Sequence, residues 1–261
     1  MTEFYEGELD TLMERLCNSI SSFDKIWVKR LIPATEEQIQ QLQDILAEYH
    51  YTIPAAYLYF LRKMGQDDGD LLERELDGCE ADIDTVLELQ DEKDLEKGLL
   101  KFCYSSEYFI GFYMKLSSMD DNPVITYPVI TDIEEKNAES FEKYLFQRAF
   151  HMYQRSFLHS TFNSSSVCNE KKDKEECRTC PHQFITAKER MDLVVQTAKS
   201  CGIKKAWFSD QTHFICYNSD YAFEINVYSG YSISFCCNDE KMLKQVEYPH
   251  ISTFFRIIRN C

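Results

Sequence analysis

The chain has 261 residues, of which 44% are hydrophobic and 14% aromatic, so it can build a packed core and is not a disordered acidic chain. Its 44 Asp and Glu residues against 28 Lys and Arg residues give a formal net charge of -16. No apolar run approaches the roughly 18 residues that a membrane span requires, and the opening MTEFYEGELD lacks the basic and apolar regions of a signal peptide. We therefore expect a soluble cytoplasmic protein that does not contact membranes.

The negative charge is concentrated in one part of the chain. Residues 1–150 hold 32 acidic and 14 basic residues, a net of -18, whereas residues 151–261 hold 12 and 14, a net of +2. Within the first part, residues 66–96 carry 14 acidic residues and two basic ones. Such a field repels nucleic acid and attracts a basic partner. It is either a partner-binding surface or a solvated face that keeps the protein in solution.

The first half predicts three helices in succession. Leu9, Leu12, Met13, Leu16 and Ile20 share one face of an amphipathic helix. Thr35-Glu36-Glu37-Gln38 is a capping box that opens a second helix, and Ile53-Pro54 opens a third that ends at Gly65.

Short β-like runs follow the acidic stretch. We expect strands at 83–89, 102–104, 108–116 and 124–129, the middle two joined as a hairpin, and then a closing helix on which Phe141, Tyr144, Leu145, Arg148 and Ala149 share a face. Helices followed by strands form an α+β order with a mainly antiparallel sheet, rather than alternating βαβ units.

A polar, Cys-containing stretch divides the chain. Residues 159–183 are rich in Ser and Lys, which predicts a linker between domains. Beyond it we expect a helix over 186–201 with Gly202 as C-cap, strands at 204–208, 212–217, 221–228 and 231–237, and short helices at 239–246 and 252–258. The predicted domains are 1–158, a linker over 159–185, and a smaller α+β unit over 186–261.

The segment from Ile32 to Asp70 carries a resemblance to a known family. Its capped acidic helix, its apolar-Pro pair opening an aromatic helix and its Gly-containing turn resemble the start of the Smi/Knr-type (SUKH) superfamily. The hairpin around Phe109–Tyr113 and the helix through Ser140–Leu145 are similar to that family's ordering, so the resemblance covers about residues 24–150. It implies a binding module rather than an enzyme. Bacterial members look like immunity proteins that neutralise a cognate toxin, often a nuclease, and fungal members look like regulatory scaffolds.

The charge distribution and the resemblance point to the same kind of partner. A nuclease toxin presents a basic cleft for phosphates, which an acidic face can occupy in place of nucleic acid. We expect the partner-binding face to include acidic residues that follow the third helix, namely Asp67, Asp68, Asp70, Glu73, Glu75 and Asp77. The alternatives are a regulatory scaffold of the same fold, and a zinc-dependent or redox protein centred on the second half.

The eleven cysteines raise a separate question about metal and redox chemistry. They are odd in number and lie mostly in apolar segments, which indicates free thiols in a reducing compartment. Cys168, Cys177, Cys180 and His182 include one C-x2-C pair and would close a tetrahedral structural zinc site. The other interpretation is exposed thiols in a loop, so we expect no cofactor other than this candidate zinc.

The sequence offers little for catalysis. It has no Gly-x-Ser-x-Gly, no His-Glu-x-x-His and no Gly-rich phosphate loop. Cys216 with a histidine such as His213 is a conceivable nucleophile and base, but Cys216 lies in a predicted strand, where an inert core thiol is expected. We therefore expect a protein that is not an enzyme.

Overall fold

The computed structural model describes residues 4–72, 79–106, 110–117, 120–128, 134–166, 187–211, 213–227 and 230–246. The chain forms an α+β fold with two antiparallel sheets. It divides into two compact units, Thr2–Met152 and Tyr153–Cys261. The two units differ in charge: the first has a net charge of -18 and the second has a net charge of +2.

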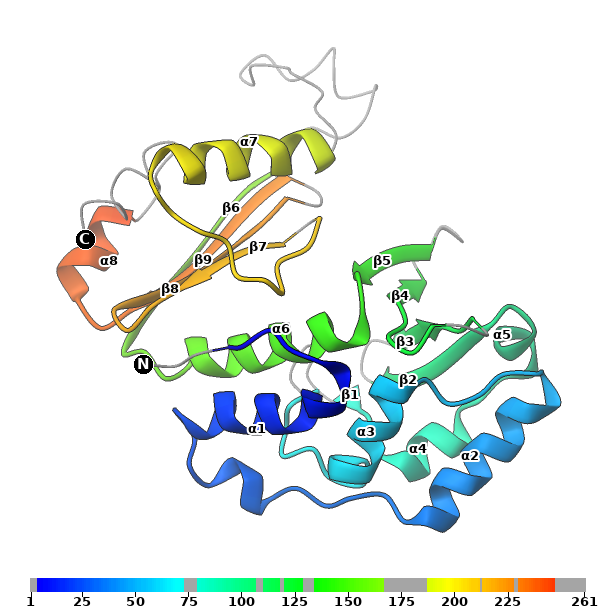
Figure 1. The fold of residues 1–261 in the computed structure, drawn as a ribbon. Coiled ribbons are helices and arrows are strands. Elements are labelled where there is room, and N and C mark those ends of the chain that lie inside the picture. Colours follow the sequence, from blue (N-terminus) through cyan, green and yellow to red (C-terminus); the bar gives the residue numbers. More distant parts are fainter. Residues whose placement is uncertain are drawn as a thin grey trace. The chain divides into compact units, whose positions relative to one another are not determined.

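The first unit places helices against a five-stranded sheet of order β1-β2-β3-β4-β5 (Figure 1). All four strand pairs are antiparallel and join neighbours in the chain, so the sheet is a meander. Its elements in chain order are η1 (Leu9–Thr11), α1 (Leu12–Ser21), η2 (Trp27–Lys29), α2 (Glu36–Glu48), α3 (Ala55–Met64), β1 (Cys79–Glu80), α4 (Ile83–Glu88), α5 (Glu92–Glu96), β2 (Leu99–Ser105), β3 (Ile110–Lys115), β4 (Ile125–Pro128), β5 (Glu134–Ala138) and α6 (Phe141–Gln154).

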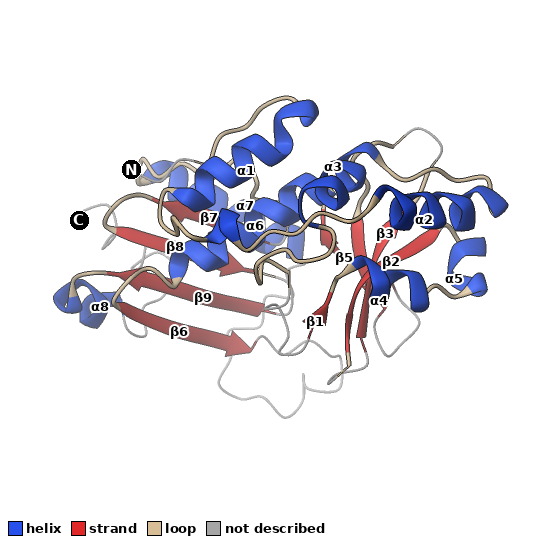
Figure 2. Ribbon diagram, turned by 90° about the horizontal axis from the view of Figure 1, so that it is seen from below, coloured by secondary structure: helices blue, strands red, loops and turns tan. Residues whose placement is uncertain are grey.

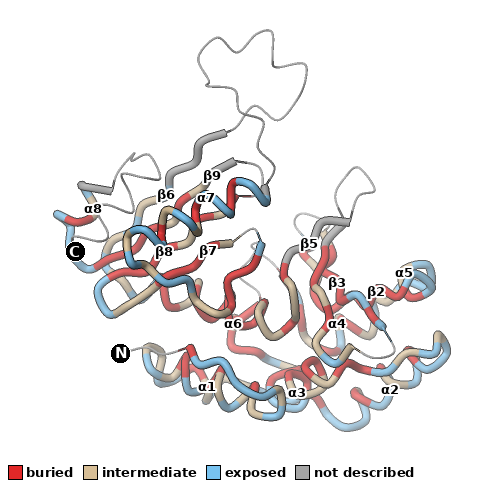
Figure 3. Tube along the Cα trace, turned by 45° about the horizontal axis from the view of Figure 1, so that its top comes forward, coloured by how far each residue is buried: buried red, intermediate tan, exposed pale blue. Residues whose placement is uncertain are grey.

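The capping box that begins α2 is confirmed. The Thr35 hydroxyl accepts a hydrogen bond from the Gln38 N–H at 3.2 Å, and the Gln38 side chain accepts one from the Thr35 N–H at 2.9 Å. Two backbone donors that the first turn leaves unpaired are thereby satisfied. The apolar residues Ile39, Leu42 and Leu46 of α2 are buried. Buried and exposed segments alternate along this helix (Figure 3).

Replacing Thr35 with alanine should lower the free energy of unfolding by about 1 kcal/mol, because the Gln38 N–H loses its acceptor. Urea unfolding followed by circular dichroism measures the change. The control is Thr52→Ala, an exposed threonine before α3, which should leave the midpoint nearly unchanged. Equal effects of the two substitutions would contradict a capping role for Thr35.

An aromatic cluster forms the core of the first unit. It brings Tyr57 and Phe60 of α3, Phe102 of β2 and Phe141 and Tyr144 of α6 together. Phe141 lies at the centre, with ring centroids 5.5, 5.7 and 5.6 Å from those of Tyr57, Phe60 and Phe102, all in edge-on geometry. Each of these rings is buried. The cluster joins helices α3 and α6 to strand β2 of the sheet.

The second unit is a four-stranded antiparallel sheet of order β6-β9-β8-β7 with α7 along one face (Figure 2). Its elements are β6 (His159–Ser166), α7 (Ala187–Ser200), β7 (His213–Tyr217), β8 (Tyr221–Asn226), β9 (Gly230–Cys237) and α8 (Glu240–Val246). Met191, Val194 and Ala198 of α7 pack on Phe214, Phe223, Phe235 and their neighbours. Gly202 follows α7 with φ +76°, which confirms the predicted C-cap region.

Three sequence predictions of local structure are wrong. Residues 83–89 begin helix α4 instead of a strand, because Asp82 accepts a hydrogen bond from the Thr85 N–H and caps it. Residues 159–166, assigned to the linker, form β6 and pair along their whole length with β9. Residues 204–208 form irregular backbone that ends in a turn at 207–208, and the Ala206 N–H bonds the Ile215 carbonyl. The predicted helix at 252–258 and linker residues 167–185 lie outside the described residues.

Candidate functional site

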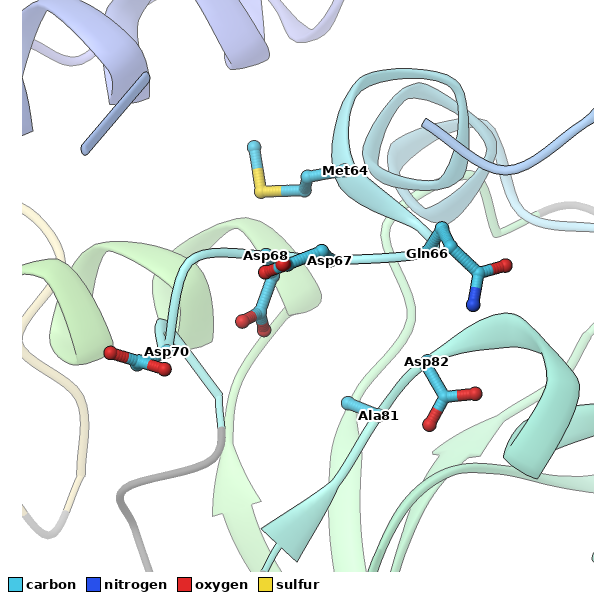
Figure 4. A pocket seen from close by; sticks show the side chains of 7 residues that line it. All are labelled: Met64, Gln66, Asp67, Asp68, Asp70, Ala81 and Asp82. Carbon is cyan, nitrogen blue, oxygen red and sulfur yellow. The ribbon is translucent and has the colours of Figure 1, made fainter. Parts of the chain in front are cut away.

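The acidic residues after α3 line a pocket of about 290 Å³ in the first unit. The 66–70 segment forms one side and the residues just before α4 form the other (Figure 4). We call it the acidic pocket, and its lining residues are Met64, Gln66, Asp67, Asp68, Asp70, Ala81 and Asp82. Four of these seven residues carry carboxylates and none is basic.

Backbone contacts hold the 66–70 segment in place. Ile32 and Asp67 form an isolated antiparallel bridge, with the Ile32 N–H 2.9 Å from the Asp67 carbonyl and the Asp67 N–H 3.1 Å from the Ile32 carbonyl. The Trp27 indole N–H lies 3.1 Å from the carbonyls of both Asp68 and Gly69. Gly69 has φ +65°, and a Cβ there would come within 2.7 Å of the Trp27 indole nitrogen, so glycine is required.

Asp68 is the buried carboxylate of the pocket. One of its oxygens accepts from the Leu71 N–H and the other from the Leu72 N–H, each at 3.0 Å. Burial raises the pKa of Asp68 to about 6, although these two hydrogen bonds lower it, and the charges of Asp67 and Asp70 raise it further. At 8% exposure Asp68 is not part of an exposed face, which corrects the expectation for this residue. It shapes the segment and adds a charge that depends on pH.

Asp67, Asp70 and Asp82 occupy different electrostatic positions around the pocket. Asp67 is exposed and accepts from the Gly69 N–H at 2.8 Å. Asp70 pairs with Arg30 at 3.0 Å, and Arg30 also contacts Asp24 at 3.3 Å, so this cation is shared between two carboxylates. Asp82 caps α4 through one oxygen, which accepts from Thr85.

A hydrogen-bonded side-chain group borders the pocket beside Gln66. The Gln38 amide donates to Gln66 at 3.0 Å and to Asp84 at 2.6 Å, and the Gln66 amide donates to Asp84 at 3.1 Å. These bonds tie α2, the 66–70 segment and α4 to one another. The border of the pocket beside Gln66 is therefore preorganised, since each of the three elements is held by the other two.

Sequence reasoning found part of this site. Of the six expected acidic residues, Asp67, Asp68 and Asp70 line one pocket. Glu73, Glu75 and Asp77 lie outside the described residues. Gln66 and Asp82 were missed. Both lie within the acidic run, but only the close approach of the two segments shows that they belong to the same pocket.

The candidate zinc ligands Cys168, Cys177, Cys180 and His182 all lie outside the described residues. In the ranges that the structure describes, no three or more His, Cys, Asp and Glu side chains are grouped to hold a metal ion.

The described cysteines are free thiols, at positions 17, 79, 103, 201, 216, 236 and 237. Cys216 is 7% exposed, and burial raises its pKa to about 11, which disfavours the thiolate that a nucleophile requires. His213 and Cys216 are an odd number of positions apart on β7, so they point to opposite faces of the sheet.

The chain matches no protein-family model, no curated protein and no solved structure. Within the described part of the chain, every helix is too short or too polar to cross a bilayer.

Proposed function

We propose that this protein is a non-enzymatic binding module that takes a basic segment of another protein into the acidic pocket. The observation that carries the proposal is the gathering of four carboxylates around one preformed pocket with no basic residue among its lining. Such a pocket favours a Lys ammonium or an Arg guanidinium, because each can meet two or more carboxylates at once.

The charge of the whole first unit supports the same role. Its net of -18 adds a long-range attraction to the local fit of the pocket. Attraction of this kind speeds the encounter with a basic protein and weakens as salt is added. The same field opposes binding of nucleic acid, since phosphates would meet carboxylates.

The partner that we propose is the basic domain of a cognate toxin, such as a nuclease. This proposal follows from the Smi/Knr-type (SUKH) resemblance of residues 24–150, which implies an immunity protein. The acidic pocket would occupy the cleft in which a nuclease binds the phosphates of its substrate. A regulatory scaffold of the same fold is the alternative. We propose the cytoplasm as the location, because free thiols at the described cysteines suit a reducing compartment.

Binding of a fluorescent hexalysine peptide tests the pocket directly. The pocket variant combines Asp67→Asn with Asp70→Asn and so removes two negative charges. Asparagine at position 67 still offers an acceptor for the Gly69 N–H, and asparagine at position 70 tolerates the backbone φ of 69° there. We expect the variant to bind the peptide about tenfold more weakly at low salt, with a shallower salt dependence. Stopped-flow mixing should show that most of the loss is in the association rate.

The matched control is Glu48→Gln with Glu92→Gln, two exposed acidic residues of the same unit, which changes the net charge by the same amount. It should retain most of the binding. Equal losses in the two double variants would mean that only overall charge attracts the peptide, and would reject the pocket as the site. The same two double variants can then be compared for binding to a basic protein, if one is encoded by a gene adjacent to the gene for this protein.

A further inference from the structure

A cluster of polar side chains in the second unit centres on His213, where β7 begins. The ring Nδ1 lies 3.2 and 3.3 Å from the two carboxylate oxygens of Asp210. On the other side of the ring, Nε2 lies 3.0 Å from the Asn226 amide nitrogen and 3.7 Å from the Glu224 carboxylate. Glu224 and Asn226 are two positions apart on β8, so both point to the face on which His213 lies.

The cluster is largely withdrawn from water. The side chains of His213, Asp210 and Glu224 are 17%, 3% and 13% exposed. Two carboxylates thus lie within 4 Å of one imidazole in a region of low dielectric, and both favour the imidazolium over the neutral ring. This arrangement satisfies the carboxylates best when the ring carries a proton on each nitrogen.

The Asn226 amide can serve either state of the ring. With the neutral ring, Nδ1–H donates to Asp210 and Nε2 accepts from the Asn226 amide. A half-turn of the amide, which has the same shape in both orientations, presents its oxygen to an Nε2–H instead. Protonation then gives Nε2–H the Asn226 oxygen as its acceptor, with the Glu224 carboxylate at an ion-pair distance of 3.7 Å. The proton comes from water, the hydrogen bond with Asn226 reverses direction, and no other covalent bond changes.

We propose that His213 is a proton-operated latch that holds the 206–210 segment against the edge of β7. Proton uptake at Nε2 places a positive ring between the Glu224 carboxylate, 3.7 Å away, and the Asp210 carboxylate, and makes the hydrogen bond from Nδ1–H to Asp210 charge-assisted. Loss of the proton leaves two carboxylates beside a neutral ring and weakens the hold on Asp210.

Asp210 is the residue that transmits the change to the 206–210 segment. Its carboxylate also accepts from the His213 backbone N–H at 2.8 Å, and its own N–H donates to the His213 carbonyl at 3.1 Å. Further along the edge, the Ala206 N–H bonds the Ile215 carbonyl at 2.7 Å and the Ser209 hydroxyl accepts from the Ile215 N–H at 3.0 Å. The segment therefore covers the outer edge of β7, which would otherwise be open to pairing.

Among the described residues, further charged groups lie on two other elements near this end of the sheet. Arg190 of α7, which packs on the opposite face, is buried, and its Nε donates to the Val227 carbonyl at 2.7 Å. Lys204 and Lys205, which precede the 206–210 segment, are exposed. Arg190 keeps its charge across the accessible pH range and the two exposed lysines are screened by water, whereas histidine is the residue type whose charge changes near neutral pH.

Titration of the imidazole in the full chain by NMR tests the latch. His213 is identified among the six histidines by the resonance that His213→Gln removes. We expect its ring to bind a proton at least about tenfold more tightly than the free side chain, whose midpoint is about pH 6.5. Glu224→Gln should lower the midpoint while leaving it above that of the free side chain, because Asp210 remains. A wild-type midpoint at or below about 6.5 would overturn the proposal.

Hydrogen exchange at the Ala206 amide tests whether protonation of His213 holds the 206–210 segment against β7. After correction for the intrinsic pH dependence of exchange, protection of this amide should fall severalfold as His213 loses its proton, and should stay flat in His213→Gln. The control is His159→Gln, another histidine of the same sheet, which should preserve the wild-type profile. Protection that does not follow the His213 titration would show that the proton is bound without latching the segment, and would reject the latch.

Discussion

Phe141→Ala should lower the free energy of unfolding of the first unit by about 3–5 kcal/mol, the range for a fully buried aromatic side chain. The substitution removes the ring that contacts Tyr57, Phe60 and Phe102 from the middle of the cluster. The neighbouring rings come from three different elements and cannot all move in to fill the space. A loss of this size approaches half of the stability of an ordinary domain.

Trp27 provides the measurement, because it is fully buried in the first unit, whereas Trp207 lies in the second. In a Trp207→Phe background, indole fluorescence during urea unfolding reports the first unit alone, which avoids treating two units as one transition. The control is Tyr5→Ala, an aromatic residue 56% exposed in the same unit, which should shift the midpoint little. A loss below about 1 kcal/mol for Phe141→Ala would mean that the neighbouring rings repack into the space, contrary to what we expect.

Local signals in the sequence predicted most helices of this protein. The capping box at Thr35 and the apolar spacing of Ile39, Leu42 and Leu46 determine α2 within a few residues of chain, so no distant contact is needed to predict it. The same holds for α3, which ends at Gly65 as expected. By contrast, Ile83 and Val86 are β-branched and favour a strand by composition, but the Asp82 cap on the Thr85 N–H and the contacts of Gln38 and Gln66 with Asp84 stabilise a helix.

Strand β6 shows what a local reading misses. Its sequence HSTFNSSS has one large apolar residue, Phe162, which is 67% exposed, so no hydrophobic alternation marks it as a strand. Its strand conformation comes from pairing with β9, whose partner residues lie 64 to 78 positions away in the chain. Non-local pairing of this kind outweighs intrinsic preference, which is weak in strands.

The candidate site was predicted in composition but not in geometry. The acidic run indicated a negative surface, and Asp67 and Asp70 fit that description. The sequence could not show that Asp68 turns inward to bind the N–H groups of Leu71 and Leu72. That orientation depends on the bridge between Ile32 and Asp67 and on the indole of Trp27, both distant in sequence. The residue type predicted the charge, and the packing decided its exposure.

Asp68→Asn should change how the stability of the protein depends on pH. The pKa of Asp68 is raised from its ordinary 3.8 to about 6 in the folded protein, chiefly by burial. Between these values the folded state keeps a proton that the unfolded state has lost, so this residue makes the free energy of unfolding fall as the pH rises. The total contribution is about 3 kcal/mol; it is small at pH 4 and complete above about pH 7.

The effect is isolated by comparing the free energy of unfolding of the variant with that of the wild type at several pH values. At pH 4 the variant should be less stable than the wild type. The carboxyl oxygens of Asp68 accept hydrogen bonds from two backbone N–H groups, and in the variant the NH2 of the asparagine faces one of them and cannot accept. As the pH rises to 7 the difference should move by about 3 kcal/mol in favour of the variant, since only the wild type must then hold a buried charge. Urea unfolding of the Trp207→Phe background through Trp27 measures it.

Thr52→Ala is the control, because Thr52 is an exposed residue of the same unit and carries no titratable group. Its difference from the wild type should stay constant between pH 4 and 7. If the Asp68→Asn difference were equally constant, the carboxyl of Asp68 would be ionised throughout, and its contacts with Leu71 and Leu72 would outweigh its burial. If it moves as expected, the charge of the acidic pocket changes near pH 6, and binding of a basic peptide should weaken below that pH because one of four carboxylates becomes neutral.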